Sequence, residues 1–470
     1  MSPSQHHLIH TTTGIAGPSL RARRRRSVAV STVAVGALLG TLGVSSASAA
    51  LPVVSDSSEV VHWNQVAATT LAAVPGPNGG APPALAINMG MVQGAVYDAV
   101  NAIGPKQHRP YLMLDTRTGA KASMDAAVAT AAYDVLSELV VAAPERAAFP
   151  GRAALLNTLS TAYDTSLSSI DDDASKKQGI AVGRAAAGAM IVAREGDGRF
   201  GPSAWVSNDG PGHWQPLLSA AGVPVLDPTP WVGNVRPFLI QSPSQFRSAP
   251  PPALDSEQWA TEFNEVKSLG RATGSTRTDD QTYRAKWWQS APVLSWNEVA
   301  RQLITRNELD APDSARLLAL QNLSSADAAI NCWNDKYHFD FWRPWNAITR
   351  ASEDGNPATD PDATWTALLT APYPEWTSGH NCLDGAHATV LRMFFGDDPE
   401  GGPFQITSTF VNPGGPAVRT FDTFSEPLAE LIEARIWAGL HYRGGDVAGQ
   451  VLGRNVANFG AANYFQPVGN

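Results

Sequence analysis

The sequence predicts an all-α protein built as a multi-helix bundle. Apolar residues recur at i, i+3, i+4 and i+7 through Ala-rich segments such as 84–103 and 124–143, which is the period of a helix with one buried face. No run of alternating apolar and polar residues is long enough for a sheet core, and no internal repeat is present. We therefore expect about ten or more helices, packed as one bundle or as two bundles side by side.

The first element in chain order is a secretory signal peptide over residues 1–49. A basic stretch, "RARRRR", is followed by an apolar run over 28–44 and by small residues, "SASAA". The paired arginines also fit a twin-arginine export signal. An uncleaved membrane anchor is the alternative, although the apolar run is shorter than the roughly 20 residues that a span needs. We expect a secreted, extracellular protein.

Two helical regions follow, separated by an irregular connection. Residues 50–196 carry helical periodicity and end at a Gly-Asp-Gly sequence. Residues 197–252 are rich in Pro, Gly, Trp and Ser and show no period. Helical periodicity returns in 253–470, and every cluster of chemically suggestive residues lies there. This last region is the expected catalytic domain.

Charge and cysteine content narrow the function classes. The whole chain has a net charge of −9, and without the signal peptide, which holds five arginines and no acid, 29 basic residues face 43 acidic ones. A surface this acidic argues against nucleic acid or an anionic membrane as the main partner. Cys332 and Cys382 are too few for a disulfide scaffold, and either one disulfide or two buried thiols fits the sequence.

The first cluster of interest is "KYHFDFWRP", residues 336–344. Lys336 and Arg343 lie seven residues apart, so on a helix they would share a face, and the proline that follows would end or bend that helix. The aromatic residues between them indicate burial, and buried cations need a counter-charge. A bound anion would provide it, and so would an internal salt bridge to Asp335 or Asp340.

The second cluster is "EWTSGHNCLDGAH", residues 375–387. Ser378 and Gly379 fall at the start of a predicted helix, where free backbone N–H groups and the helix dipole attract an anion. A simple N-cap at Thr377 or Ser378 is the alternative.

The same stretch also permits two other sites. Ser378 and His380 could be a hydrolase nucleophile with its base. His380, Asp384 and His387 stand at i, i+4 and i+7, so on a helix they could bind zinc.

The third cluster is "ARIWAGLHYRGGD", residues 434–446. A helix carrying Arg435 is expected to end near Gly439, and His441 follows just beyond it. An isolated histidine at such a place is more often a surface or capping residue, so this cluster by itself is ambiguous.

Taken together, the three clusters resemble the vanadium haloperoxidase and type 2 phosphatidic acid phosphatase superfamily. The shared pattern is Lys, six residues, Arg-Pro; then Ser-Gly-His; then Arg, three residues, Gly, one residue, His. It covers Lys336 to Asp446. The sequences "VVHWNQ" and "MVQGAVYDAVNAI" in the N-terminal half are similar to the bacterial secreted haloperoxidase-like branch.

The resemblance implies a vanadate cofactor and a role for each matching residue. His441 would be the apical ligand to vanadium, and His380 an acid/base on the opposite side. Tyr373 falls where the family varies and where halide selectivity has been attributed. The oxygens of vanadate, or of a phosphoryl group, would be bound by five residues: Lys336, Arg343, Ser378, Gly379 and Arg435.

The resemblance leaves two enzymatic readings and one non-enzymatic reading. The first, which we favour, is a haloperoxidase that uses hydrogen peroxide and a halide. The second is an acid phosphatase that hydrolyses a phosphate ester through a phospho-histidine at His441. The third is an oxyanion-binding relative without activity.

The chain departs from the family pattern at three positions. Thr377 and Ala434 replace a proline and a serine. The aspartate expected four residues after His441 is Gly445, so the carboxylate that would orient this histidine is displaced or absent. Two glycines allow a backbone adjustment that could bring Asp446 into its place.

The cysteines add one expectation. Cys332 lies one turn before Lys336, and Cys382 one turn after Ser378. If Lys336 and Ser378 converge on one anion, the two sulfurs approach each other and a disulfide could tie the two helices together.

Overall fold

The computed structural model describes residues 56–468 apart from 77–78, 104–107, 114–120, 142–148, 203–205, 207 and 411. The expected signal peptide at 1–49 lies outside the described residues. No helix among the described residues is long and apolar enough to cross a membrane.

The prediction of an all-α bundle is confirmed. In the N-terminal half the helices are α1 (Ser58–Ala72), α2 (Pro82–Ile103), α3 (Met124–Val141), α4 (Arg152–Ser168) and α5 (Ala174–Ala193). In the C-terminal half they are α6 (Glu257–Leu269), α7 (Asp279–Trp287), α8 (Pro292–Arg306), α9 (Ala311–Phe339), α10 (Pro344–Thr349), α11 (Gly379–Phe395), α12 (Ser425–Trp437) and α13 (Arg443–Asn463). Short 3₁₀ turns, η2 (Pro230–Asn234) and η3 (Ala351–Glu353), lie in the connections.

The strands of the described residues form one small antiparallel pair. β1 (Phe404–Thr407) pairs with β2 (Val418–Phe421), with Phe404 opposite Phe421. The pair packs against α8, and Phe404 and Phe421 are buried there. Through these side chains the pair joins the hydrophobic core of the helical body.

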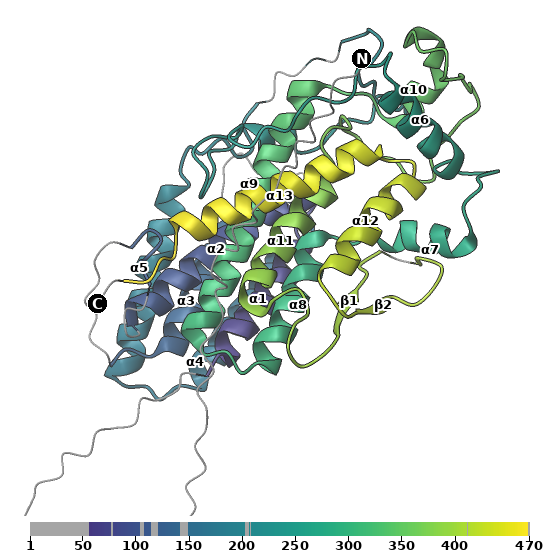
Figure 1. The fold of residues 1–470 in the computed structure, drawn as a ribbon. Helices are drawn as coiled ribbons and strands as arrows, with labels where there is room; N and C mark the ends of the chain where they lie inside the picture. Colours follow the sequence, from purple (N-terminus) through teal and green to yellow (C-terminus); the bar gives the residue numbers. More distant parts are fainter. Residues whose placement is uncertain are drawn as a thin grey trace, which may run out of the picture.

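The long helix α9 is the axis of the fold (Figure 1). It contacts α2 on one side and α11 and α13 on others, and most of its residues are buried. Figure 1 shows α3, α4 and α5 gathered at one end of the molecule and α6 and α10 at the other. The Ala, Leu and Ser residues of α9 let the neighbouring helices pack closely, while buried polar side chains such as Asp327 and Asn331 face other segments.

The irregular connection of 197–252 lies against α9 through carboxylate and amide side chains. Asp327 accepts backbone N–H groups of residues 238–240 at 2.6–2.8 Å. Asn331 accepts the N–H of Phe246 at 2.9 Å, and Asp335 that of Ser248 at 3.0 Å. These bonds satisfy backbone donors that have no helix or sheet partner, so the connection is held without regular structure.

Small residues let α13 cross closely over the start of α11. A Cβ added at Gly453 would fall 2.1 Å from the carbonyl oxygen of Cys382, and one at Gly449 would fall 2.8 Å from that of Ser378. No larger residue fits at either place. The crossing fixes the second and third turns of α13 against the first turn of α11.

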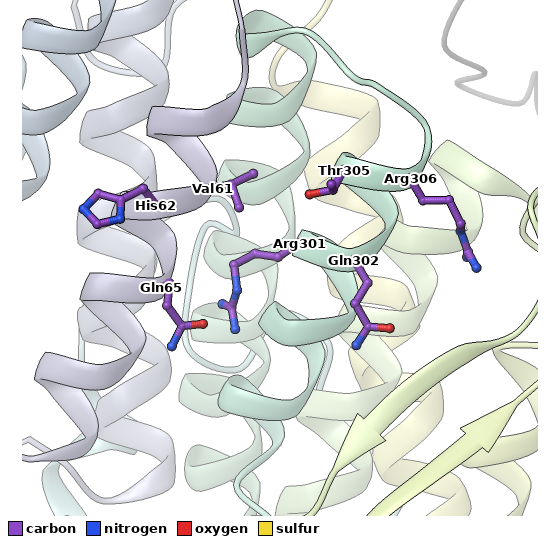
Figure 2. Close-up of a pocket in the computed structure, with 7 residues that line it drawn as sticks. All are labelled: Val61, His62, Gln65, Arg301, Gln302, Thr305 and Arg306. Atoms are coloured by element: carbon purple, nitrogen blue, oxygen red, sulfur yellow. The ribbon is translucent and has the colours of Figure 1, made fainter. Parts of the chain in front are cut away.

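A solvent-accessible depression lies between α1 and α8, with a volume of about 560 Å³ (Figure 2). Its lining includes His62 and Gln65 on α1 and Arg301 and Gln302 on α8. It shares no residue with the three sequence clusters.

Candidate functional site

The three sequence clusters come together at one end of α9. The close contacts across them include Arg343 Nη1 to His441 Nε2, at 3.1 Å. The residues that the sequence singled out lie on α9 (Lys336), just before α10 (Arg343), at the start of α11 (Ser378, Gly379 and His380), on α12 (Arg435) and in the turn before α13 (His441). All are buried except His380, which is partly exposed.

Lys336 and Arg343 meet, but not on one helix face. α9 ends at Phe339, and Asp340 takes a left-handed conformation with φ of 49°. Arg343 then precedes α10, and Pro344 is its first residue. The expectation that Pro344 ends or bends the helix of Lys336 is therefore wrong, because proline begins a new helix where its missing N–H costs nothing.

The Lys336 ammonium is fully buried and hydrogen-bonded to backbone carbonyls. Its Nζ donates to Pro374 at 3.2 Å, to Glu375 at 3.0 Å, and also to Thr377. The ring of Tyr373 lies 5.1 Å away. Burial lowers the pKa of Lys336 to about 8.

Arg343 spreads its guanidinium across two segments. Nε donates to the carbonyl of Tyr373 at 2.9 Å, Nη1 to that of Leu440 at 2.7 Å, and Nη2 to that of Pro374 at 3.3 Å. Burial lowers its pKa, while Tyr373 and Glu375 act in the opposite direction. The residue links the loop before α11 to the turn before α13.

Arg435, on the last turn of α12, is the third buried cation. Its Nη1 donates to the carbonyl of Trp288 at 3.3 Å and to the side-chain oxygen of Gln289. Its Nε has no hydrogen-bond partner among the described residues. Burial lowers its pKa to about 10, and the negative charge of Asp446 raises it.

The counter-charge of these cations is not an adjacent carboxylate. Within the described ranges none of the three forms an ion pair. The acids considered from the sequence pair elsewhere: Asp335 with Arg247 at 3.2 Å, and Asp340 with His213 at 3.0 Å. Three buried cations with neutral acceptors, one of them with an N–H left over, form a donor set suited to an oxyanion.

Ser378 and Gly379 stand at the start of α11, as predicted. Ser378 is in the N-cap position, but its hydroxyl makes no capping bond; Asn381 Nδ2 donates to it at 3.2 Å. A Cβ at Gly379 would lie 3.1 Å from the Trp333 ring and 3.9 Å from Cε of Lys336. The glycine thus brings the helix N-terminus next to Lys336, where its free N–H groups face a cation-rich space.

His380 lies at the rim of the cluster. Its Nε2 is 3.2 Å from the carbonyl oxygen of Ser290, which can only accept, so Nε2 carries the proton and Nδ1 the lone pair. Desolvation, followed by the positive charge of Arg435, lowers its pKa well below the ordinary value. His380 is therefore neutral near pH 7.

His441 is fixed from both sides of its ring. Nε2 is 3.1 Å from Nη1 of Arg343, and Nδ1 is 2.6 Å from Oε1 of Glu375. Burial, and then the charges of Arg343 and Lys336, lower the pKa of His441 well below its usual range. Burial raises the pKa of Glu375 to about 8, against the effect of the same two cations.

Glu375 was not among the predicted site residues. Its separation from His441 in sequence, 66 residues, hides the contact. Asp446, which the two glycines could have brought into the place of the missing aspartate, instead accepts from Nδ2 of Asn381 at 2.7 Å. The available signal was Gly445, a glycine at the place where the family pattern has a carboxylate.

The described residues are not arranged as the hydrolase or the zinc alternative requires. Ser378 and His380 are directed to Asn381 and Ser290 respectively, not to each other. The described part of the chain holds no group of three or more His, Cys, Asp or Glu side chains able to bind a metal ion. Asp384 accepts from Nε1 of Trp296 at 2.6 Å.

Cys332 and Cys382 are neighbours, as the sequence led us to expect, and both are free thiols. The hydroxyl of Thr377 lies 3.4 Å from the sulfur of Cys332 and 3.3 Å from that of Cys382. The Thr377 hydroxyl therefore contacts both thiols, one on α9 and one on α11, beside Lys336.

Comparisons with known proteins confirm the resemblance drawn from the three clusters. Residues 316–469 match a family model described as the second helical-bundle domain of VCPO. Over 280 residues the chain is 24% identical to vanadium chloroperoxidase of Curvularia inaequalis. That match covers 46% of this chain and 45% of the relative, so the chain spans less than half of that relative's length.

Solved structures share the fold over nearly the whole chain. A bacterial vanadium-dependent iodoperoxidase matches with a TM-score of 0.67 and 21% identity, covering 89% of this chain and 99% of that one. An apo-type bacterial vanadium-dependent chloroperoxidase matches with a TM-score of 0.64 and 17% identity, covering 83% and 94%. At these identities the matches show the fold.

Proposed function

We propose that this chain is a vanadate-dependent haloperoxidase, which oxidises a halide with hydrogen peroxide. The observation that carries the proposal is the meeting of three buried cations, none in an ion pair within the described ranges, with His441, whose Nε2 lies 3.1 Å from Nη1 of Arg343. The vanadium peroxidases of similar fold support the choice of vanadate among oxyanions.

The donor set fits vanadate. Five residues would hold its oxygens: Lys336, Arg343, Ser378, Gly379 and Arg435. His441 Nε2 would be the ligand to the metal. An oxyanion would compete for Lys336 with neutral carbonyls, and a charged oxygen is the stronger acceptor. Bound vanadate supplies a Lewis acid that activates peroxide toward attack by a halide.

The chain's own residues would move the proton and exclude water. His380 is neutral, with the lone pair on Nδ1, so it can take a proton from incoming peroxide and return it to a leaving oxygen. Trp333 and Tyr373 pack their rings 5.1 Å apart beside Lys336 and form an apolar wall there. Because this apolar wall excludes water, the electrostatic effect of the cations is stronger.

The test is a paired assay on the chain without residues 1–49. Peroxide-dependent bromide oxidation is measured with added orthovanadate, beside hydrolysis of a chromogenic phosphate ester. We expect halide oxidation that is lost in His441→Ala and kept in His62→Ala, a control in the depression between α1 and α8. Hydrolysis without halide oxidation would reject the haloperoxidase, and full activity of His441→Ala would reject the site.

The phosphatase remains a second candidate because of the same Nε2 atom. Arg343, which has only donors, faces Nε2 of His441, so this nitrogen is unprotonated, and its lone pair could attack phosphorus once a phosphoryl oxygen takes over the N–H of Arg343. His380 would then protonate the leaving oxygen. The hydrolysis arm of the paired assay decides between the two.

We also propose that the protein is exported, from the basic, apolar and small-residue order of residues 1–49. N-terminal sequencing of protein recovered from culture medium should begin near Ala50. Retention of the full chain inside the cell would contradict this.

A further inference from the structure

We propose that Glu375 is the positioning residue of His441, in the place that the family pattern gives to an aspartate at position 445. This inference rests on the proposed function for its role in catalysis, but its geometry is independent of vanadate. The carboxylate is carried on the loop before α11 instead of on the first turn of α13.

The contacts of Glu375 are those of an orienting carboxylate. It is fully buried, and its Oε1 lies 2.6 Å from Nδ1 of His441 and 3.3 Å from the backbone N of Tyr442. Its own backbone is fixed at both ends: its N–H donates to Phe341 at 2.9 Å, and its carbonyl accepts from Lys336 at 3.0 Å. The side chain therefore approaches His441 from a rigid base.

The carboxylate of Glu375 lies in the space that a side chain at position 445 would need. A Cβ at Gly445 would fall 2.4 Å from Oε1 and 2.9 Å from Oε2 of Glu375. No real Cβ approaches an oxygen that closely, so a side chain at 445 would displace the carboxylate of Glu375 from its position beside His441.

Asp446 does not fill the role. Its Oδ1 accepts from Asn381 Nδ2 at 2.7 Å, on the side of α11. Its backbone continues α13 by donating to the carbonyl of Tyr442 at 3.2 Å. The two glycines before it have no side chain, and this leaves room for acidic side chains from other segments. Glu375 lies against Gly445, and Glu262 lies against Gly444.

The carboxylate selects the tautomer of His441. Arg343 can only donate, so Nε2 must accept, and the ring proton then sits on Nδ1, where Glu375 accepts it. Without Glu375 this buried N–H would lose its partner, and the ring would be free to turn or to exchange tautomers. The lone pair on Nε2, which a metal or a phosphoryl group needs, would no longer be held in place.

The first experiment reads the unloaded protein. In wild type labelled with ¹⁵N-histidine, the ring nitrogens of His441 should report Nδ1–H and an unprotonated Nε2, assigned by difference from His441→Gln. In Glu375→Ala, which leaves Nδ1 of His441 without an acceptor, the population of that tautomer should fall. A wild-type ring protonated on Nε2 would overturn the proposal, whatever the variants do and whether or not vanadate binds.

The second experiment measures orthovanadate binding by calorimetry. Removal of an outer carboxylate of this kind weakens metal binding about 10- to 100-fold, and we expect that loss for Glu375→Gln. Glu262→Gln is the matched control. Glu262 is also a buried glutamate beside the first turn of α13; it accepts from the N–H of Gly444 at 3.2 Å and does not contact His441. Equal affinities of Glu375→Gln and wild type would refute the role.

A relocated carboxylate separates positioning from structure. Gly445→Asp alone should lower the unfolding temperature and the vanadate affinity, because its side chain meets that of Glu375. Glu375→Ala combined with Gly445→Asp should bind vanadate more tightly than either single variant. A double variant no better than Glu375→Ala would contradict the proposal. If the wild type binds no vanadate, the proposed function is rejected. The role of Glu375 is then tested by the tautomer measurement alone.

Discussion

The stability of this protein in acid should depend on one histidine outside the site. His387 is fully buried in the middle of α11, and neither of its ring nitrogens has a hydrogen-bond partner among the described residues. Burial lowers its pKa from 6.5 to about 3. The folded chain therefore keeps His387 neutral at a pH where the unfolded chain protonates it.

The sign and size of the effect follow from that difference. Between about pH 3 and 6.5 the unfolded state binds more protons at this position than the native state, so the free energy of unfolding falls as the pH falls. The contribution is fully present above pH 6.5. A shift of about 3.5 units corresponds to about 5 kcal/mol when it is complete, and to about 3 kcal/mol between pH 7 and pH 4.

The perturbation is His387→Leu, which fills the site with an apolar side chain that cannot titrate. Urea unfolding is measured at pH 7 and pH 4 for wild type, for His387→Leu and for His62→Leu as a control on α1. The variant should lose about 3 kcal/mol less than wild type on going to pH 4, while the control loses as much as wild type. Equal losses in wild type and His387→Leu would refute the assignment of a neutral, unpartnered histidine.

Three further predictions concern the site and its surroundings. Arg435→Gln should weaken orthovanadate binding about 10- to 100-fold by calorimetry, because a charged donor is lost; unchanged affinity would remove Arg435 from the site. Burial raises the pKa of Asp384 to about 7, so its ionisation costs stability as the pH rises from about 4 to 7. Asp384→Asn, which can still accept from Trp296, should therefore unfold at higher urea than wild type at pH 8, and an equal or lower midpoint would contradict this. Mild oxidation should join Cys332 to Cys382, since the thiols are neighbours, and peptide mapping that finds both thiols free would show that they cannot meet.

The sequence predicted where anion donors would gather, but not how the backbone brings them together. The start of α11 at Gly379 agrees with its Ser-Gly signal, because a helix start is encoded within a few residues. Lys336 and Arg343 were expected on one helix, and they meet instead across the end of α9 and the start of α10. A periodic pattern could not reveal that break, since the left-handed turn at Asp340 depends on tertiary contacts with Asn208 and His213.

Glu375 could not be predicted from the sequence for a different reason. It stands in the cluster that the sequence singled out, three residues before Ser378, but its partner is 66 residues away. The family pattern places the orienting aspartate four residues after His441, and at that position this sequence has Gly445, which has no carboxylate. The contacts around Gly445 support the proposal that the glycine makes room for the carboxylate of Glu375, which would replace the missing aspartate.

The site is held in position before any anion arrives, and α9 is the reason. One stretch of this helix fixes two loops: Asp335 holds the connection at Ser248, and Lys336, the next residue, holds the loop at residues 374–377. Trp376 then joins the two loops, because its Nε1 donates to the hydroxyl of Ser248 and to the carbonyl of Ala249, each at 3.0 Å. Glu375 lies between these anchors, so the carboxylate that orients His441 has little freedom of its own. Binding energy from an oxyanion would then not be consumed in ordering this loop, which is the advantage of a site built on a rigid support.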